Sequence, residues 1–244
     1  MNQVWAIYLR EMRILKTRLP MLLGSMSVAP FLYILAFGLA LGRDISVSGH
    51  DYMSFLLPGL VALSSMTQAF SIAGEINIAR FYWNVFDEIQ ASPVRDSAYV
   101  AGEILAGVTR GVMAAVVIIL FGFIFGVETK IGPFFWLAVI LNSMVFSSLA
   151  VALAMVVREH SMQMMLNTFL ITPMAFLGGT FFPVDRLPEW AQVILYVLPI
   201  TYSSRIIRSA ALDGEIGIAS FLILSVMFGG LFIIATRLVK RARD

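Results

Sequence analysis

The stretch FLGGTFFPVDRLPEW, residues 176–190, decides how many times this chain can cross a membrane. It follows a long apolar run and concentrates two glycines, two prolines and three charges in a few residues. Between Glu189, near its end, and Arg205 lie only 15 uncharged residues, 190–204. A helix of that length reaches about 22 Å, which is short of the ~30 Å hydrocarbon core of a bilayer. The chain is therefore expected to turn back here instead of crossing.

The composition is that of an integral membrane protein. Of the 244 residues, 59% are hydrophobic and only 13% are charged, about half of the roughly 25% that a soluble domain carries. There is no cysteine, which excludes disulfides, thiolate metal sites and cysteine nucleophiles.

Six stretches between charged residues are long and apolar enough to span a bilayer. They are residues 19–42, 52–74, 104–127, 131–157, 160–184 and 216–236. An even number of spans places both termini on one side of the membrane. The segments on that side hold most of the lysines and arginines, so the positive-inside rule predicts cytoplasmic termini. We predict an all-α integral membrane protein, with one domain over residues 1–244.

Residues 1–19 have the pattern of an amphipathic helix. Trp5, Tyr8, Met12, Leu15 and Leu19 recur at spacings of three and four, with basic residues on the other faces. This pattern predicts a helix lying in the cytoplasmic interface of the membrane. The alternative is a merely basic flank of the first span.

The longest connection follows the second span and contains a second short helix, predicted over residues 80–93. Phe81, Val85 and Ile89 fall on one face, and Pro93 ends the helix. Asp87 and Glu88 give this segment an acidic end on an otherwise basic side. Such a helix suits docking into the groove of a soluble partner. The alternative is an interfacial helix whose aromatics lie among lipid headgroups.

No catalytic or metal-binding motif is found. The sequence lacks G-x-x-x-x-G-K-[ST], the loop that holds the phosphates of ATP, so the chain is not predicted to be an enzyme. No G-x-S-x-G, H-E-x-x-H or paired His/carboxylate cluster occurs either, so no metal site is predicted. His160, in a short turn at the membrane edge, is expected to be solvated.

Two charged residues fall in or beside the third span, where transferring a charge from water into hydrocarbon costs free energy. Glu103 and Arg110 are two helical turns apart, roughly 10 Å, too far for a direct bridge. Intramembrane charges commonly mark a transport path. The alternative is a structural pair, for example Arg110 with Glu75 at the end of the second span. Gly107 and Gly111 mark a close helix contact, either within one subunit or across a dimer.

Residues 180–208 are predicted to form a re-entrant hairpin on the outer side. Pro183 and Pro188 stop and restart the helix, and the Gly178–Gly179 pair permits a sharp turn. Trp190, Tyr196 and Tyr202 are residue types that favour the membrane interface. Arg205 and Arg208 are then expected at the outer surface, within reach of anionic headgroups. The alternative is an ordinary amphipathic surface helix.

Three stretches, in this order, resemble the permease subunits of type-2 ATP-binding-cassette (ABC) exporters of drugs, lipo-oligosaccharides and polysaccharides. They are YMSFLLPGLVALSS (52–65), NVFDEIQASPV (84–94) and FLGGTFFPVDRLPEWAQVILYVLPITYSSRIIR (176–208). The likeness covers essentially the whole chain. One departure is the run Val85–Glu88, where many relatives carry a Gly-Thr-Leu-Glu-like sequence.

The resemblance implies a six-span permease in the cytoplasmic membrane of a prokaryote, surrounded by lipid and without a nucleic-acid partner. It would form a dimer, preferably a homodimer, and bind two ATPase subunits that hold ATP and magnesium; the chain itself would carry no cofactor. The segment inserted into the ATPase would comprise Asp87, Glu88, Ile89, Ala91, Ser92 and Pro93. An extracellular gate would comprise Gly178, Gly179, Phe182, Pro183, Pro188, Trp190 and Tyr202.

The cargo implied is amphipathic, a hydrophobic drug or a lipid-linked saccharide. An ion-coupled secondary transporter or channel is the alternative. It would need ionisable residues buried across several spans, and Arg110 and Glu103 are the candidates here.

Overall fold

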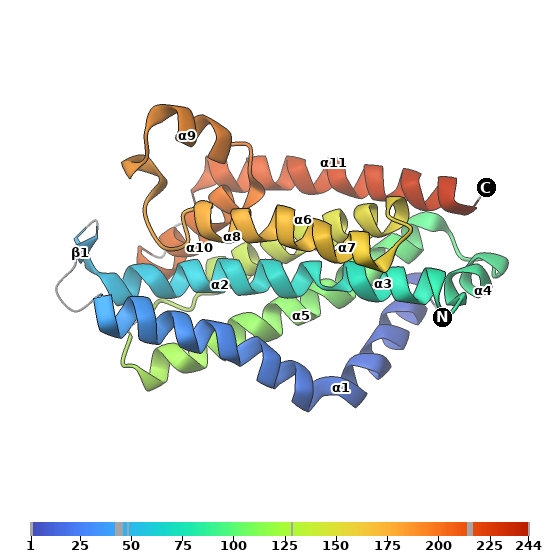
Figure 1. Cartoon of the computed structure of the whole chain (residues 1–244), viewed down its shortest axis with the longest axis horizontal. Coiled ribbons are helices and arrows are strands. Elements are labelled where there is room, and N and C mark those ends of the chain that lie inside the picture. Colours follow the sequence, from blue (N-terminus) through green and yellow to red (C-terminus); the bar gives the residue numbers. More distant parts are fainter. Residues whose placement is uncertain (1, 42–45, 48, 128, 214–216, 244) are drawn as a thin grey trace.

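The computed structural model describes residues 2–41, 46–47, 49–127, 129–213 and 217–243, which are almost entirely helical (Figure 1). Five helical segments of the described chain are long and apolar enough to cross a membrane. They are α1 (Gln3–Tyr33) with its π-helical continuation η1 (Ile34–Leu41), α2 (Tyr52–Phe70) with α3 (Ile72–Phe81), α5 (Asp96–Ile124), α6 (Pro133–Val156) and α11 (Ile218–Arg243). They correspond to the predicted spans one to four and six.

The predicted fifth span forms a shorter helical run in three parts. These are α7 (His160–Leu166), the π-helical η2 (Asn167–Ile171) and α8 (Thr172–Leu177). The run ends at Gly178, well before the expected boundary at residue 184. It is also less apolar than the other five, because it contains His160, Gln163 and Asn167. In Figure 1 it follows the same direction as the long helices.

The two ends of the bundle differ. The N-terminus, the C-terminus and α4 (Val85–Ala91) lie together at one end, which we call the termini end (Figure 1). The opposite end, which we call the hairpin end, holds the short antiparallel pair β1 (Ser46–Val47) and β2 (His50–Asp51), together with α9 (Glu189–Leu195) and α10 (Pro199–Leu212).

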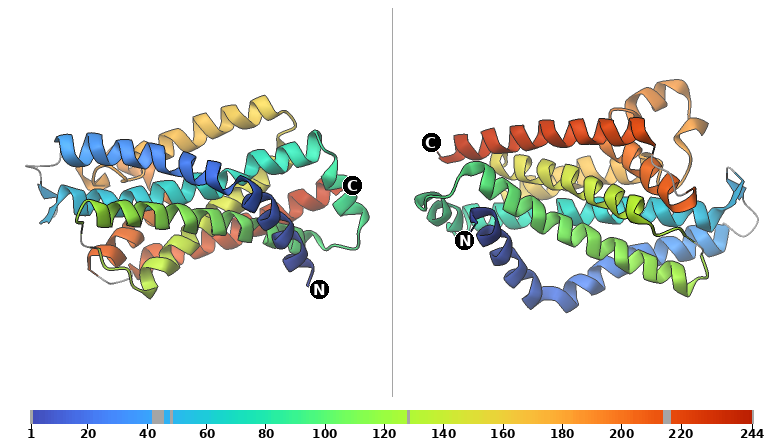
Figure 2. Two further views of the ribbon diagram at one scale, coloured as in Figure 1. Left: turned by 90° about the horizontal axis from the view of Figure 1, so that it is seen from below. Right: turned by 180° about the vertical axis from the view of Figure 1, so that it is seen from behind.

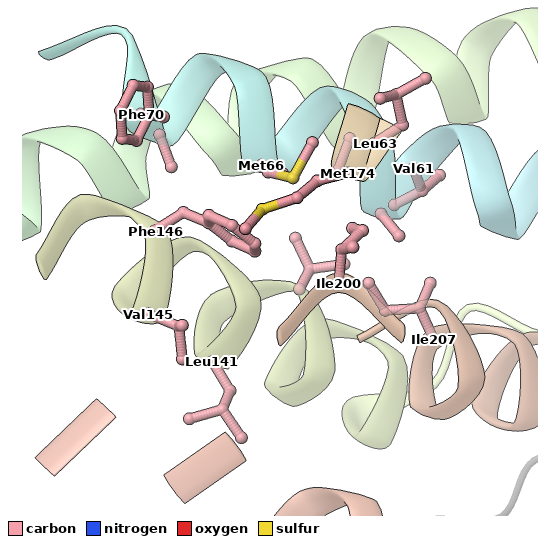
Figure 3. Close-up of a cluster of buried hydrophobic side chains, with 14 of the residues drawn as sticks. Val61, Leu63, Met66, Phe70, Leu141, Val145, Phe146, Met174, Ile200 and Ile207 are labelled. Atoms are coloured by element: carbon pink, nitrogen blue, oxygen red, sulfur yellow. The ribbon is translucent and has the colours of Figure 1, made fainter. Parts of the chain in front are cut away.

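The core is built around α2. In the most apolar 18-residue stretch of α2 and α3 (the window of that segment), 83% is buried inside the subunit. The corresponding windows of α1 and α11 are 22% and 11% buried. Figure 3 shows α2 side chains such as Met66 packed between Phe146 of α6, Met174 of α8 and Ile200 of α10. Most faces of α2 are covered by neighbouring helices, and most of its buried side chains are apolar.

Small residues let α5 approach α2 and α6 closely. A Cβ added at Gly107 would collide with Ser147 and press against the Ala69 carbonyl, and one at Gly111 would collide with Ser143 and press against the Ser65 carbonyl. The glycine pair therefore packs within the subunit, which decides between the two alternatives that the sequence left open.

The interface helix and the first span form one helix with a bend, clear in Figures 1 and 2. Pro20 lies inside α1 and removes a backbone donor, a common cause of kinks. The buried face of the first part consists of Ile7, Glu11 and Leu15. From the predicted stripe only Leu15 is buried, while Trp5 is 49% exposed. The periodicity identified an amphipathic helix, but the face that packs on α5 is a different one.

Candidate functional site

The short helix α4 at the termini end is smaller than predicted. It covers Val85–Ala91, and Phe81 belongs to the end of α3. Asn84 separates the two helices with a positive φ of 52°, a left-handed conformation that asparagine tolerates better than most residues. The expectation of one helix over 80–93, with Phe81 on the same face as Val85 and Ile89, is therefore wrong.

A residue outside the predicted set anchors α4. Phe86 is buried, and its ring lies 5.5 Å from that of Tyr99 on α5. The guanidinium of Arg80 lies 5.2 Å from the centre of the same ring, and Arg80 also donates to the Met155 carbonyl at 2.7 Å. Val85 and Ile89 are half-buried beside this anchor. The face opposite is free, with Asp87 and Glu88 exposed.

The turn after α4 is held by both ends of the chain. Gln3 donates to the Pro93 carbonyl at 2.7 Å and accepts from the Arg95 backbone N–H at 3.1 Å. Arg243, at the end of α11, lies 3.6 Å from Asp96. Within the turn, the Ser92 hydroxyl donates to the Ile89 carbonyl at 2.5 Å, while Ala91 and Pro93 are exposed. The sequence gives no local signal for the Gln3 contact, since its partners lie about ninety residues away.

Two aromatic side chains project between α3 and α4. Tyr82 is 66% exposed and Trp83 is 54% exposed. Together with Asp87 and Glu88 they form an exposed surface of mixed aromatic and acidic character at the termini end. We call these four residues the α4 surface.

Arg110 and Glu75 form the ion pair that the sequence suggested. Two guanidinium nitrogens of Arg110 donate to the two carboxylate oxygens of Glu75, at 2.8 and 2.5 Å. The Arg110 side chain is 2% exposed, whereas the Glu75 side chain is 30% exposed. The bidentate geometry joins α5 to α3.

Glu103 lies apart from this pair. It is buried, and it lines a small cavity together with Glu75, Arg10 and Glu11. Arg10 donates to Glu11 at 2.6 Å. Glu11 was not predicted as a site residue, because a charged residue of an interface helix is expected to face water.

A groove runs along the side of the bundle between α1, α2 and α8. Its volume is about 190 Å³. We call it the lateral groove. Tyr33, Phe176 and Ile171 supply apolar surface, and the polar lining comprises Ser25, Ser64, Thr67, Gln68 and Thr172. The sequence could not point to it, because three segments far apart in the chain form its walls.

At the hairpin end, Pro188 restarts the helix as predicted, but Pro183 does not stop one, because α8 already ends at Leu177. Pro183 immediately precedes a short 3-10 turn, η3 (Val184–Arg186), and Pro188 immediately precedes α9. Gly178 caps α8, and a side chain there would collide with Ile200. Gly179 has a φ of +80°, which glycine adopts without strain.

The other predicted gate residues differ in exposure. Trp190 is 71% exposed. Tyr202 is half-buried and donates to the Tyr196 carbonyl at 2.7 Å, while Phe182 is half-buried against the core.

The two arginines of this hairpin have protein partners. Arg205 donates to Asp185 and to the Tyr196 hydroxyl, both at 2.9 Å. Arg208 lies 3.7 Å from the centre of the Phe55 ring and donates to the Gly179 carbonyl at 2.8 Å. The expectation that Arg208 faces lipid headgroups is therefore wrong, because its guanidinium ties α10 to α2 instead.

Comparison with known proteins covers most of the chain. The profile described as "ABC-2 type transporter" matches residues 2–212. The chain is 28% identical over 221 residues to the inner membrane transport permease YadH of Escherichia coli K12, covering 87% of this chain and 84% of that protein. It is 30% identical over 204 residues to nodulation protein J of Rhizobium meliloti, covering 82% of this chain and 78% of that protein.

Proposed function

Because the chain belongs to the ABC-2 type transporter family, we propose that it is the membrane subunit of an ATP-driven exporter. It resides in the inner membrane and moves an amphipathic cargo outward. It works as a dimer, preferably of identical chains, with two ATPase subunits. The observation that carries this proposal is the α4 surface, which is exposed, acidic and aromatic, and is built on a helix tied to several spans.

The six-span topology is part of this proposal. Five crossings would place the termini on opposite sides, yet both termini lie at one end of the bundle (Figure 1). The run from His160 to Leu177 begins beside Tyr82 at the termini end and ends beside α10 at the hairpin end. It is therefore assigned as the fifth span, although its share of apolar residues is lower than that of the other five. The concentration of basic residues assigns the termini end to the cytoplasm.

Motion enters the permease through α4. Phe86 fixes α4 to α5, Gln3 fixes the following turn to α1, and Arg243 fixes that turn to α11. A displacement of Asp87 and Glu88 by the ATPase would thereby be transmitted to three spans, α5, α1 and α11. The neighbouring α3 continues from α2, so a fourth span is connected as well.

The lateral groove is the proposed cargo site. It lies between spans and combines hydroxyl and amide groups with aromatic surface, as an amphipathic molecule requires. The hairpin of α9 and α10 stays at the far end and is the proposed outer gate.

An ion-coupled transporter is supported less well. Such a protein needs free ionisable groups along a path through several spans. Arg110 already donates two hydrogen bonds to Glu75 in a bidentate ion pair. Glu103 lies near the termini end, at the cavity lined by Arg10 and Glu11.

Co-purification tests the proposal. The tagged permease, expressed together with its neighbouring genes, should retain an ATPase subunit. Reversing both acidic charges, Asp87→Lys with Glu88→Lys, should abolish retention and transport. Glu189→Lys, an exposed reversal at the hairpin end, is the control for ATPase retention, which it should not change. If the double reversal keeps an intact complex and full transport, the coupling assignment is wrong.

A further inference from the structure

A second pocket lies between α3 and α7, close to the termini end. It holds about 190 Å³. Its lining includes Ser71, Gly74, His160, Gln163, Met164 and Asn167. We call it the α3–α7 pocket. It is separate from the α4 surface and from the lateral groove.

The polar groups of this pocket are buried but unsatisfied. Gln163 is 3% exposed, and neither its amide nitrogen nor its amide oxygen has a hydrogen-bond partner among the described residues. The Nδ1 atom of His160, one turn earlier on the same face, is also buried without a partner there. Buried polar atoms are nearly always paired in folded proteins, since an unpaired one costs as much as a lost hydrogen bond. These atoms need a polar partner between α3 and α7, which a water or a ligand group can supply.

The lining restricts the chemistry of that group. None of the described lining residues is a lysine, arginine, aspartate or glutamate, so no formal charge recognises a phosphate or an ammonium. An amide offers both a donor and an acceptor, and Asn167 and Ser71 add further polar atoms. Hydroxyl groups, which both donate and accept, are the complementary partners. A headgroup of the size of one sugar, rich in hydroxyls and uncharged, matches this lining.

The pocket lies beside the lateral groove, although none of the described residues lines both. Ser71, the residue that follows α2, lines the pocket, and Thr67, one turn earlier on α2, lines the groove. On the facing run, Met164 of α7 lines the pocket and Ile171 of η2 lines the groove. Met164 is 61% exposed. The polar pocket therefore has next to it a groove in which Tyr33, Ile171 and Phe176 supply apolar surface.

We propose that the α3–α7 pocket binds the uncharged, hydroxyl-rich headgroup of an amphiphile whose alkyl chain lies in the lateral groove. The role of this site in transport rests on the proposed function, since it names the class of cargo that the exporter would accept from the inner leaflet. The binding itself does not depend on ATP or on the ATPase.

Photolabelling of the purified permease in lipid nanodiscs tests the site. The probe is decyl β-glucoside with a diazirine at the end of its alkyl chain, and the matched probes carry a trimethylammonium or a phosphate headgroup. The glucoside should label peptides that line the lateral groove, and unlabelled decyl glucoside should compete. Equal labelling by all three probes, or labelling without competition, would overturn the proposal and leave water as the occupant.

Two variants give independent checks. Gln163→Leu removes both unpaired amide atoms and should reduce competed labelling about tenfold, the effect expected of one or two lost hydrogen bonds. Its melting temperature should equal or exceed that of the wild type, because an unsatisfied group has been removed. Gly74→Leu keeps every polar group but fills the pocket, since a Cβ at this position already contacts His160 at 3.9 Å. Gln192→Leu, on α9, is the control for Gln163→Leu. Wild-type labelling in both pocket variants would refute the assignment.

Two sources can supply this headgroup, and further measurements separate them. A glycolipid retained by the wild type in detergent-free membrane extracts, and lost in Gln163→Leu, identifies a resident lipid. ATP-dependent movement of the glucoside probe across proteoliposomes that contain the ATPase identifies cargo. Because the labelling uses the permease alone, its failure leaves the exporter proposal standing. Failure of ATPase retention, in turn, leaves the binding site standing.

Discussion

Replacing Glu75 by glutamine should destabilise the protein more than replacing its partner Arg110 by methionine. The reason is the unequal burial of the two side chains, 2% exposed for Arg110 and 30% for Glu75. In Glu75→Gln a buried guanidinium loses its counter-charge and one of its two charged hydrogen bonds. Breaking a buried pair in this way costs about 3–5 kcal/mol, and the partial exposure of Glu75 favours the lower end, about 3 kcal/mol. In Arg110→Met the remaining carboxylate can reach water in the cavity, so the cost should be about 1–2 kcal/mol.

The double variant separates the pair from its members. With Glu75→Gln and Arg110→Met combined, no uncompensated charge is left, and the cost should fall to about 1 kcal/mol, below that of Glu75→Gln alone. The free energy of unfolding can be measured by pulse proteolysis across an SDS titration in mixed micelles. The reasoning is refuted if Arg110→Met is at least as costly as Glu75→Gln, or if the second substitution does not recover stability.

The same double variant decides between the two roles of these charges. If the pair only joins α5 to α3, the double variant should regain ATP-driven transport along with its stability. If the charges lie on the transport path, transport should stay lost while stability returns.

Three further predictions follow from the packing. Gly111→Ala, which forces a Cβ into Ser143 and against the Ser65 carbonyl, should destabilise by about 3 kcal/mol in the same titration, whereas Gly230→Ala, with nothing within 4 Å, should be neutral or mildly stabilising. A spin label introduced by Glu88→Cys should become more mobile in Gln3→Ala, because that variant frees the turn after α4. Unchanged mobility in Gln3→Ala, or an equal rise in the control Asn2→Ala, would contradict the role of the Gln3 contacts. In this cysteine-free chain, Trp190→Cys should react quickly with an impermeant thiol reagent from outside the cell and Arg208→Cys slowly. Fast labelling of both would argue against the packing of Arg208 on Phe55.

The membrane-spanning pattern could be predicted because water and hydrocarbon impose it residue by residue. Charges bound the apolar stretches, so α2, α5, α6 and α11 follow from composition alone. Arg110 could be matched to Glu75 because a charge inside a span demands a partner, and few are within reach. Pro188 acts locally, through a missing N–H and a fixed φ, so the start of α9 is visible in the sequence.

What could not be predicted depends on contacts between distant segments. Phe86 was one aromatic among several, and only the position of Tyr99 makes it the anchor of α4. The stripe in residues 1–19 showed that the helix has two faces, but the partner α5 determined which of them is buried. Arg208 could be placed at the outer end by topology, yet its contact with Phe55 depends on how α10 folds back onto α2.

The unequal burial of the spans indicates which parts of the subunit can move. Displacing α2 would open the contacts of a helix that is 83% buried over its apolar window, and α6 is 72% buried. The corresponding windows of α1 and α11 are only 22% and 11% buried within the subunit, so a shift of either helix would disturb less buried surface than a shift of α2. They are also the helices that Gln3 and Arg243 connect to the turn after α4. Since α1 forms one wall of the lateral groove and the fixed α2 forms another, a displacement of α1 by α4 would change the width of the groove while the core stays intact.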